Sequence, residues 1–535
     1  MKPAIPALLL SLPLLAFGGL DTIVKIDSGL VAGTGTTVLS YKGIPYAAPP
    51  IGDLRWKPPQ PAKPWSGIRV ANAYPAVCPQ FELFPGGKQS EDCLGLNVWT
   101  PAHRGAEKLP VMVWIHGGGF IIGASSQSAY DGEALSAQGV VLVSINYRLG
   151  IFGFMAHPGL SRESAQGVSG NYGILDMVAA LEWVKRNIGA FGGDPNNVTI
   201  FGESAGGTAV CMLMVVPQAQ GLFQKVISES AAWMNGPISH LKESWYGRIS
   251  MEKFGESFGP DIAALRAKST ADILKLAGGP DMGGDKADRG EAFMPVVDGV
   301  VFPDDPAKLF SAGRFAKPAL IAGTNADEGT LMGGPPVHNL ADLRKYAEKT
   351  FGPQADAMLA AYSAQSDAEA YNAAAKASGD LLFLEGTRYV LRAASKSNPK
   401  TYQYYFTRVS GIGRRIKWGS YHASEVPYVF ATLPDSVYGT SPSMLGNFAV
   451  DADSYNDQDT KISNGMSSAW VRFAKSGNPN GPGVPQWPAF NTDRESYIEF
   501  GDRIATGTAL RKKQLDFMTD FMNSLRARTS VSGTR

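Results

Sequence analysis

Short apolar runs recur along the chain, and their lengths suit strands. The run at residues 111–115 is apolar throughout, and the run at 140–147 is apolar over most of its length. Runs without regular polar alternation are typical of strands buried on both faces of a sheet. Shorter runs of the same kind predict further buried strands at residues 197–201, 225–228, 319–323 and 401–406.

Helical periodicity separates the apolar runs. Between residues 171 and 192, apolar side chains recur at spacings of four, three, three and four positions, which predicts a helix with one buried face. A second helix is predicted at 205–216, just before Pro217, and a final one at 509–526. Strands that alternate with helices predict an α/β protein with a parallel sheet covered on both faces.

Two long stretches, residues 235–317 and 333–400, are richer in Ala, Lys, Asp and Gly than their surroundings. We interpret them as helical insertions that roof a site. No polar linker is long enough to separate independent domains, so residues 19–535 are expected to form a single domain.

The first residues have the pattern of a secretory signal peptide. Lys2 precedes an apolar stretch at residues 4–16, and Ala16 and Gly18 supply the small residues of a cleavage site. We therefore predict a signal peptide at residues 1–18 and a secreted or periplasmic protein. The stretch is too short to span a bilayer, and no other run approaches the roughly 18 residues that a span needs. No stable membrane anchor is expected.

Composition narrows the classes of partner. The 49 Lys and Arg residues nearly balance the 48 Asp and Glu residues, and a net charge of +1 provides no basic field for nucleic acid. Charged residues are 18% and hydrophobic residues 44% of the chain, which excludes disorder as its main state. No His or Cys pair has metal-ligand spacing and no phosphate-binding loop is present, so neither metal nor cofactor is expected.

The candidate chemistry begins at Gly202-Glu203-Ser204-Ala205-Gly206, which fits the Gly-x-Ser-x-Gly nucleophile elbow. A predicted strand precedes it and a predicted helix follows it, as an elbow requires. The flanking glycines let the backbone turn sharply, which lifts the Ser204 hydroxyl clear of the sheet at the positive end of a helix. A glycine-rich turn with a surface serine can have the same five-residue pattern, so the interpretation as a nucleophile elbow needs further support.

That support comes from Gly117-Gly118-Gly119, directly after the strand at 111–115. Backbone N–H groups in such a loop can stabilise the oxyanion that forms during acyl transfer. We assign this role to the N–H groups of Gly118, Gly119 and Ala205. His116, at the strand end, is interpreted as a hydrogen-bonded structural residue.

The base and the acid follow from the chain order of such sites, which is Ser, then acid, then His. Of the six histidines, His240, His338 and His422 follow Ser204, and the first two fall in the insertions. His422 lies in a loop that resembles a strand-to-helix turn, after the last predicted strand. Asp327 and Glu328 both follow the strand at 319–323, and spacing alone does not choose between them.

Taken together, these residues resemble the type B carboxylesterase and cholinesterase family of α/β hydrolases. The resemblance extends over essentially the whole chain after the signal. It rests on ordered motifs: Gly43-Ile44-Pro45-Tyr46, Glu91-Asp92-Cys93-Leu94, His116-Gly117-Gly118-Gly119-Phe120, Asn146-Tyr147-Arg148, Phe191-Gly192-Gly193-Asp194-Pro195, Phe201-Gly202-Glu203-Ser204-Ala205-Gly206-Gly207, Asp327-Glu328-Gly329, His422 with Glu425, and Trp487-Pro488.

The resemblance implies an α/β-hydrolase fold: a mostly parallel central sheet, helices on both faces, and helical insertions above the active site. It makes Ser204 the nucleophile, Glu328 the acid and His422 the base. It also implies a Cys78–Cys93 disulfide, while Cys211, in an apolar run, is expected to be a buried thiol. Two structural ion pairs, Arg55–Glu91 and Arg148–Asp176, and a hydroxyl near the triad, Ser230, are implied as well.

The expected substrate class follows from a loop in which this sequence differs from cholinesterases. Their loop between the matching cysteines is longer and carries a tryptophan that holds the choline cation. Here residues 79–92 contain no Trp, which argues against a choline ester. Phe120, Glu203 and Trp233 are expected at the substrate pocket, although Trp233 fits a core position equally well.

The sequence therefore predicts a serine carboxylesterase that hydrolyses a small-molecule ester through an acyl-enzyme on Ser204. One alternative is a lipase or a specialised esterase for an aromatic or toxin ester. Another is a catalytically silent binding protein with this fold, which the intact Ser204, Glu328 and His422 disfavour. The sequence fixes neither the acyl chain length nor the choice between monomer and homo-oligomer.

Overall fold

The computed structural model describes residues 22–81, 87–101, 108–236, 238–244, 248–278, 292–433 and 454–532. The predicted signal peptide at residues 1–18 lies outside this part of the chain.

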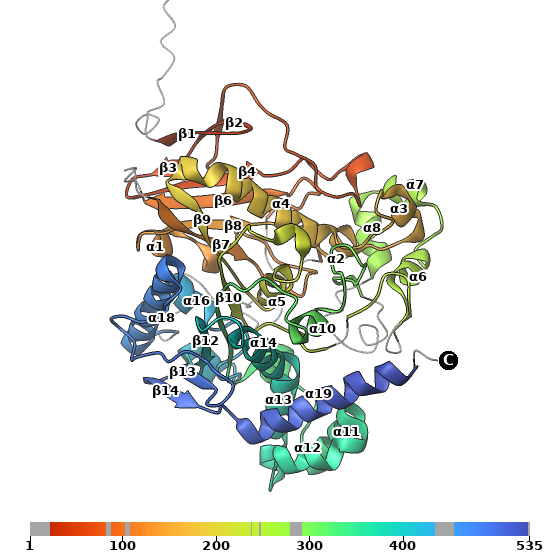
Figure 1. Cartoon of the computed structure of the whole chain (residues 1–535), viewed down its shortest axis with the longest axis vertical. Coiled ribbons are helices and arrows are strands. Elements are labelled where there is room, and N and C mark those ends of the chain that lie inside the picture. The colour runs from red at the N-terminus through yellow and green to blue at the C-terminus, as the bar shows by residue number, and fades with distance from the viewer. Residues whose placement is uncertain are drawn as a thin grey trace, which may run out of the picture.

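A large twisted sheet runs through the molecule (Figure 1). Within the described residues it has 11 strands, in the order β14 (Ile504–Thr508), β13 (Ser496–Phe500), β12 (Thr401–Phe406), β11 (Ala319–Asn325), β10 (Lys225–Glu229), β9 (Gly193–Glu203), β7 (Leu109–Ile115), β8 (Val141–Ile145), β6 (Gly95–Pro101), β4 (Val38–Pro45) and β3 (Thr34–Gly35). The strands from β13 to β8 pair in parallel, and those outside them are antiparallel. A small separate sheet contains β1 (Ile23–Ile26), β2 (Gly29–Ala32) and β5 (Ile68–Val70).

The parallel centre of the sheet confirms the prediction from apolar runs. All six predicted runs form strands, and β12 has the predicted bounds. The strands toward the two ends of the sheet were missed. At one end, β13 alternates buried and half-buried positions, and β14 is mostly exposed. Toward the other end, β6 is almost wholly buried, but Asn97 and Thr100 interrupt its apolar run. His422 therefore does not follow the last strand of the sheet, since β13 and β14 come after it.

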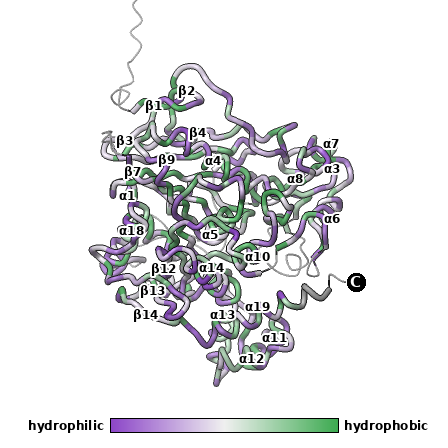
Figure 2. The backbone as a smooth tube through the Cα atoms, viewed as in Figure 1, coloured by the Kyte–Doolittle hydropathy of each residue, from purple (hydrophilic) through white to green (hydrophobic). Residues whose placement is uncertain are grey.

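Helices cover both faces of the sheet, as expected. One face packs against a core that includes α2 (Gly150–Phe154), α4 (Tyr172–Asn187), α5 (Ala205–Leu213), α10 (Pro306–Ser311) and α14 (Glu385–Ser395). The other packs against α1 (Glu133–Ser136), α16 (Val426–Phe430) and α18 (Asp457–Ser476). Hydrophobic residues follow the central strands and α5 in Figure 2. The α5 helix ends three residues before the predicted bound, although Met214 to Val216 remain buried.

Both insertions are helical. The first contains α6 (Met251–Glu256), α7 (Ile262–Arg266) and α8 (Thr270–Ala277), with α3 (Pro158–Glu163) beside α6. The second contains α11 (Leu340–Phe351), α12 (Ala355–Ala361) and α13 (Asp367–Gly379), which continues into α14. The final helix, α19 (Lys512–Ser532), packs on α11 to α13 through Met518, Phe521 and Met522, at the lower end of the molecule in Figure 1. No helix in the described residues has the length and apolarity to cross a bilayer.

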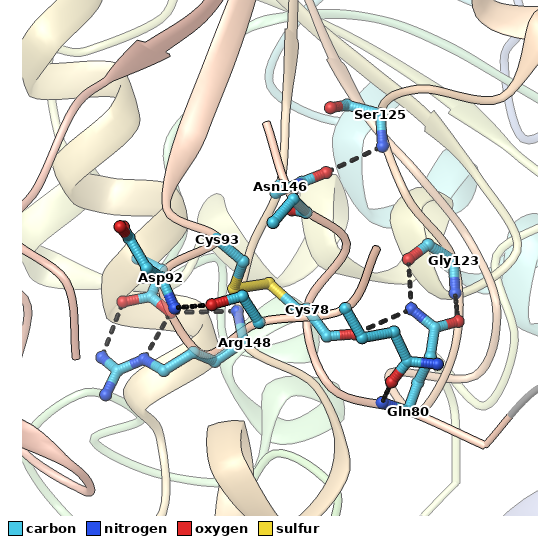
Figure 3. The surroundings of a disulfide bond; sticks show 12 residues. Cys78, Gln80, Asp92, Cys93, Gly123, Ser125, Asn146 and Arg148 are labelled. Carbon is cyan, nitrogen blue, oxygen red and sulfur yellow. Dashed lines mark hydrogen bonds and ion pairs between the residues drawn. A yellow bond between two sulfur atoms is a disulfide. The ribbon is translucent and has the colours of Figure 1, made fainter. Parts of the chain in front are cut away.

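The predicted Cys78–Cys93 disulfide is present and joins two residues that lie 15 positions apart in the chain (Figure 3). Gln80, two residues after Cys78, accepts a hydrogen bond from the Gly123 N–H at 2.8 Å and donates one to the Gly123 carbonyl at 2.9 Å. The free thiol, Cys211, is buried as expected.

Both predicted ion pairs are confirmed and are buried. Arg55 and Glu91 form a two-pronged contact, with 2.6 Å between Nη2 and Oε1. Arg148 and Asp176 form a second contact of this kind, with 2.7 Å between Nη2 and Oδ1. Each arginine also donates to backbone carbonyls, so both pairs tie loops to the body of the molecule.

We expect the disulfide to stabilise the fold through loop closure. Replacing Cys78 and Cys93 together by Ser should lower the free energy of unfolding by about 3 kcal/mol, because the open loop gains conformational freedom in the unfolded chain. Urea unfolding of the oxidised protein and of the double variant measures this difference. Cys211→Ser is the control for loss of a thiol, and equal stability of wild type and double variant would contradict the expectation.

Candidate active site

Ser204 lies at a strained turn between β9 and α5. Its backbone has φ 57° and ψ −121°, a conformation that side-chain-bearing residues rarely adopt. The turn packs on the end of β7, where a Cβ at Gly202 or Gly206 would lie 2.5 Å or 2.0 Å from the Ile115 carbonyl oxygen. Only glycine fits at those two positions, so close backbone packing explains both glycines of the Gly-x-Ser-x-Gly motif. The half-buried Ser204 is thereby fixed at the carboxyl end of the sheet.

The structure brings His422 and Glu328 together. His422 Nδ1 lies 2.6 Å from Glu328 Oε2, and both side chains are buried. The other carboxylate oxygen of Glu328 accepts hydrogen bonds from the Ser230 hydroxyl at 2.6 Å and from the Asn325 N–H at 2.7 Å. These contacts hold the carboxylate in place, and the implied position of Ser230 is confirmed.

The neighbouring Asp327, which spacing alone left open, points elsewhere. Its carboxylate accepts a hydrogen bond from the Ser420 N–H at 2.9 Å and pairs with Lys376 at 3.2 Å. The contact with His422 is therefore made by Glu328, and Asp327 fixes the loop that leads to the histidine.

The second nitrogen of His422 faces a different carboxylate. His422 Nε2 lies 3.1 Å from Glu203 Oε1, on the residue just before Ser204. Within the described residues, no hydrogen bond joins His422 Nε2 to the Ser204 hydroxyl. The imidazole is thus held between two carboxylates, with Ser204 adjacent in sequence to one of them.

These carboxylates set the charge of the imidazole. Burial opposes protonation, but the negative charges of Glu203 and Glu328 outweigh it and raise the pKa of His422 to about 9. The other buried histidine near the site, His116, has the opposite shift, because burial lowers the pKa of His116 to about 4. His116 stacks on Tyr147 at 4.5 Å and its Nδ1 contacts the Gly117 carbonyl, as expected for a structural residue.

The glycine-rich loop lies directly against Ser204. A Cβ at Gly117 would lie 3.1 Å from the Ser204 Cβ and 2.7 Å from the Glu203 carbonyl oxygen. Gly118 and Gly119 have φ values of 99° and 63°, which glycine adopts without strain. In the described part of the chain, no acceptor is recorded for the N–H groups of Gly118, Gly119 or Ala205. Their assignment as oxyanion donors stays a prediction.

The three expected pocket residues differ in their surroundings. Phe120 is fully buried and packs edge-on against Tyr147 and Phe154, and its place at the substrate pocket stays a prediction. Glu203 is buried beside His422. Trp233 is half-buried, with φ 54°, and its N–H donates to the Leu382 carbonyl.

Three further groups lie at the site: Glu229 and Phe383, which the sequence analysis did not name, and Glu425, which it named in a motif without a role. Glu229, at the end of β10, accepts a hydrogen bond from the Trp470 indole at 2.7 Å, and its backbone carbonyl accepts one from the Ser204 N–H. Glu425 accepts one from the Asn325 amide. Phe383 lies over the His422 ring, with 4.5 Å between centroids. Glu229 directly follows a predicted strand, so its position at a strand end could have identified it from the sequence. The sequence around Phe383 contains no such indication.

The other late histidines lie away from this cluster. His240 is half-buried and His338 is exposed, both in the insertions. No group of three or more His, Cys, Asp and Glu side chains among the described residues is arranged to hold a metal ion.

Comparison with known proteins identifies the family. The model of the carboxylesterase family matches residues 20–518. This chain belongs to the carboxylesterase family. It is 40% identical to a fumonisin B1 esterase of Sphingopyxis macrogoltabida, over 90% of this chain and 87% of the relative. It is 35% identical to a para-nitrobenzyl esterase of Bacillus subtilis strain 168 (89% and 94% covered) and 34% identical to a cocaine esterase of Homo sapiens (91% and 88% covered).

Solved structures show the same fold. A PNB esterase superposes with a TM-score of 0.75 at 33% identity, covering 93% of this chain and all of that one. Another PNB esterase structure gives 0.77 at 32% identity, with 93% and 99% covered. This member of the carboxylesterase family is a carboxylic ester hydrolase.

The surroundings of His422 predict an unusually basic imidazole. We expect NMR titration to give a pKa near 9 for His422. Glu203→Gln should lower that pKa by about one unit or more, because removing the negative charge destabilises the imidazolium.

The exposed residue Glu133 provides the control, since Glu133→Gln removes a carboxylate that is not among the groups that shift the His422 pKa. A His422 pKa that is unchanged in Glu203→Gln would contradict the electrostatic account of the site.

Proposed function

We propose that this carboxylesterase hydrolyses esters through an acyl-enzyme on Ser204, with His422 as general base and Glu328 as its acidic partner. The observation that carries the proposal is the 2.6 Å contact between His422 Nδ1 and Glu328 Oε2, made beside the strained Ser204 turn. A nucleophile, a base and a group that orients the base are the parts that such chemistry requires.

Acylation begins when His422 Nε2 accepts the Ser204 proton and Ser204 Oγ attacks the ester carbonyl carbon. The carbonyl oxygen becomes an oxyanion, which the N–H groups of Gly118, Gly119 and Ala205 bind. His422 then gives its proton to the departing alcohol oxygen, which leaves the acyl group on Ser204. Glu328 stays ionised and stabilises the imidazolium.

Deacylation repeats these steps with water as the nucleophile. His422 accepts a proton from water, the hydroxyl attacks the acyl carbon, and Ser204 leaves with the proton returned by His422. The products are the carboxylic acid and the free enzyme.

The resting contact of His422 with Glu203 has a consequence for this cycle. The base must be neutral and must turn Nε2 from Glu203 to Ser204 before it accepts the proton. Because Glu203 stabilises the imidazolium, activity rises as the pH increases through the pKa of His422.

For the substrate, we propose a general small-molecule carboxylic ester. The relatives are named for different esters, which supports a common reaction and leaves the pocket to select the substrate. A specialised esterase is the second candidate, because a relative at 40% identity is named for the hydrolysis of fumonisin B1.

Substitution of the three proposed residues tests the mechanism. Ser204→Ala, His422→Ala and Glu328→Gln should each lower kcat for p-nitrophenyl acetate by about 10⁴-fold, because the three groups act as one unit. Asp327→Asn is the matched control: it removes the adjacent carboxylate and should keep kcat within about tenfold. Full activity of a folded Ser204→Ala protein would refute the mechanism.

A series of p-nitrophenyl esters from short to long acyl chains tests the substrate proposal, with fumonisin B1 run beside it. A general carboxylesterase turns over the short esters, and kcat/KM falls where the acyl chain exceeds the pocket. Turnover of fumonisin B1 without turnover of any p-nitrophenyl ester would instead establish the specialised esterase.

A further inference from the structure

One helical turn contacts three parts of the proposed site. The long helix from α13 to α14 is interrupted by η8 (Asp380–Leu384), a five-residue π-helical turn. Turns of this kind are rare, and they occur frequently at functional sites because they displace side chains from their α-helical positions. Here the displaced segment lies against the catalytic end of the sheet.

The contacts of this turn reach the base, the acid and the loop after β10. Phe383 places its ring 4.5 Å from the His422 ring, at an angle of 34°. Leu382 accepts a hydrogen bond from the Trp233 N–H at 3.1 Å. Gly379, just before the turn, lies so close to the acid that an added Cβ would be 3.1 Å from the Glu328 Cβ.

A buried ionic contact anchors the same turn to the C-terminal helix. Asp380 is 2% exposed, and its Oδ2 lies 2.9 Å from Nη2 of Arg511, the residue just before α19. The same oxygen accepts a hydrogen bond from the Tyr362 hydroxyl at 2.6 Å. Arg511 has a backbone φ of 45°, a strained value for a residue with a side chain.

Stability alone does not account for this contact. Burying a carboxylate and a guanidinium removes water from both, and a buried pair of this kind often stabilises a fold no better than apolar residues of the same size. The pair does hold the π-helical turn in a fixed position. It attaches the first residue of the π-helical turn to α19, and Phe383 follows three residues later.

The geometry points to the Asp380–Arg511 pair as a positioning element for His422, acting through Phe383. This inference rests on the proposed role of His422 as the base. The Glu328 hydrogen bond fixes Nδ1 but leaves the ring free to tilt about that contact. The Phe383 ring lies against the imidazole, so it restricts that tilt and guides the turn of Nε2 from Glu203 to Ser204. Small errors in such positions reduce the rate of the chemical step more than the binding of substrate.

Two variants, alone and combined, test the inference. Phe383→Leu keeps an apolar side chain without the planar ring, and Asp380→Asn keeps the shape of the anchor without its charge. Each should lower kcat for p-nitrophenyl acetate about tenfold, with KM changed less than about twofold. The double variant should lose no more than the larger single loss, because both changes act on one element.

A matched control comes from the same pair of helices. Arg388 on α14 pairs with Asp516 on α19 at 2.9 Å, so Asp516→Asn also removes an ionic contact between α19 and this long helix. It does not touch the π-helical turn and should leave kcat unchanged. The downfield NMR signal of the His422 Nδ1 proton gives a readout independent of turnover: it should broaden in Asp380→Asn and Phe383→Leu and stay sharp in Asp516→Asn.

The outcomes separate this inference from the proposed mechanism. Unchanged kcat in Phe383→Leu, a change confined to KM, or additive losses in the double variant would each overturn the positioning role while Ser204→Ala remains inactive. An active Ser204→Ala protein in the same assay would instead refute the mechanism on which the inference rests.

Discussion

The charge balance around His422 is the constraint on which this site depends. Its imidazole lies between the carboxylates of Glu203 and Glu328, and two further buried carboxylates, Glu229 and Glu425, lie close behind. Burial and the repulsion from Glu328 raise the pKa of Glu425 to about 7, and burial and Glu425 raise the pKa of Glu229 well above its usual range. Both shifts favour the neutral carboxyl form, which lowers the negative charge near the imidazole.

The sheet determines where these groups meet. Glu203 and Glu229 are register partners on β9 and β10, and Tyr404 on β12 is paired with Gly323 on β11. A Cβ at Gly323 would lie 2.3 Å from the Tyr404 ring, so glycine lets that ring cross its strand toward the carboxylates. The same close packing operates at the Ser204 turn, where the glycines fit against the end of β7. Close packing that only glycine allows thus occurs at two places in this part of the sheet.

Helices far from Ser204 in sequence complete the site. The second insertion and the C-terminal helix share a hydrophobic cluster, and the Asp380–Arg511 ion pair joins the start of that helix to the turn that carries Phe383. Segments that carry no recognisable motif therefore contact the surroundings of His422. Relatives of similar fold are named for different esters, which is consistent with a fixed catalytic end and variable surroundings.

The sequence by itself determined the parallel centre of the sheet, the Ser204 turn, the glycine-rich loop and the candidate order of Ser, acid and His. These features depend on local rules: apolar runs mark strands buried on both faces, and glycines mark turns that other residues cannot adopt. The family resemblance chose Glu328 over Asp327. Only the tertiary structure decided the antiparallel edges of the sheet, the core position of Phe120, the Glu203 contact and the ring of Phe383 over His422, because each depends on which distant segments pack together.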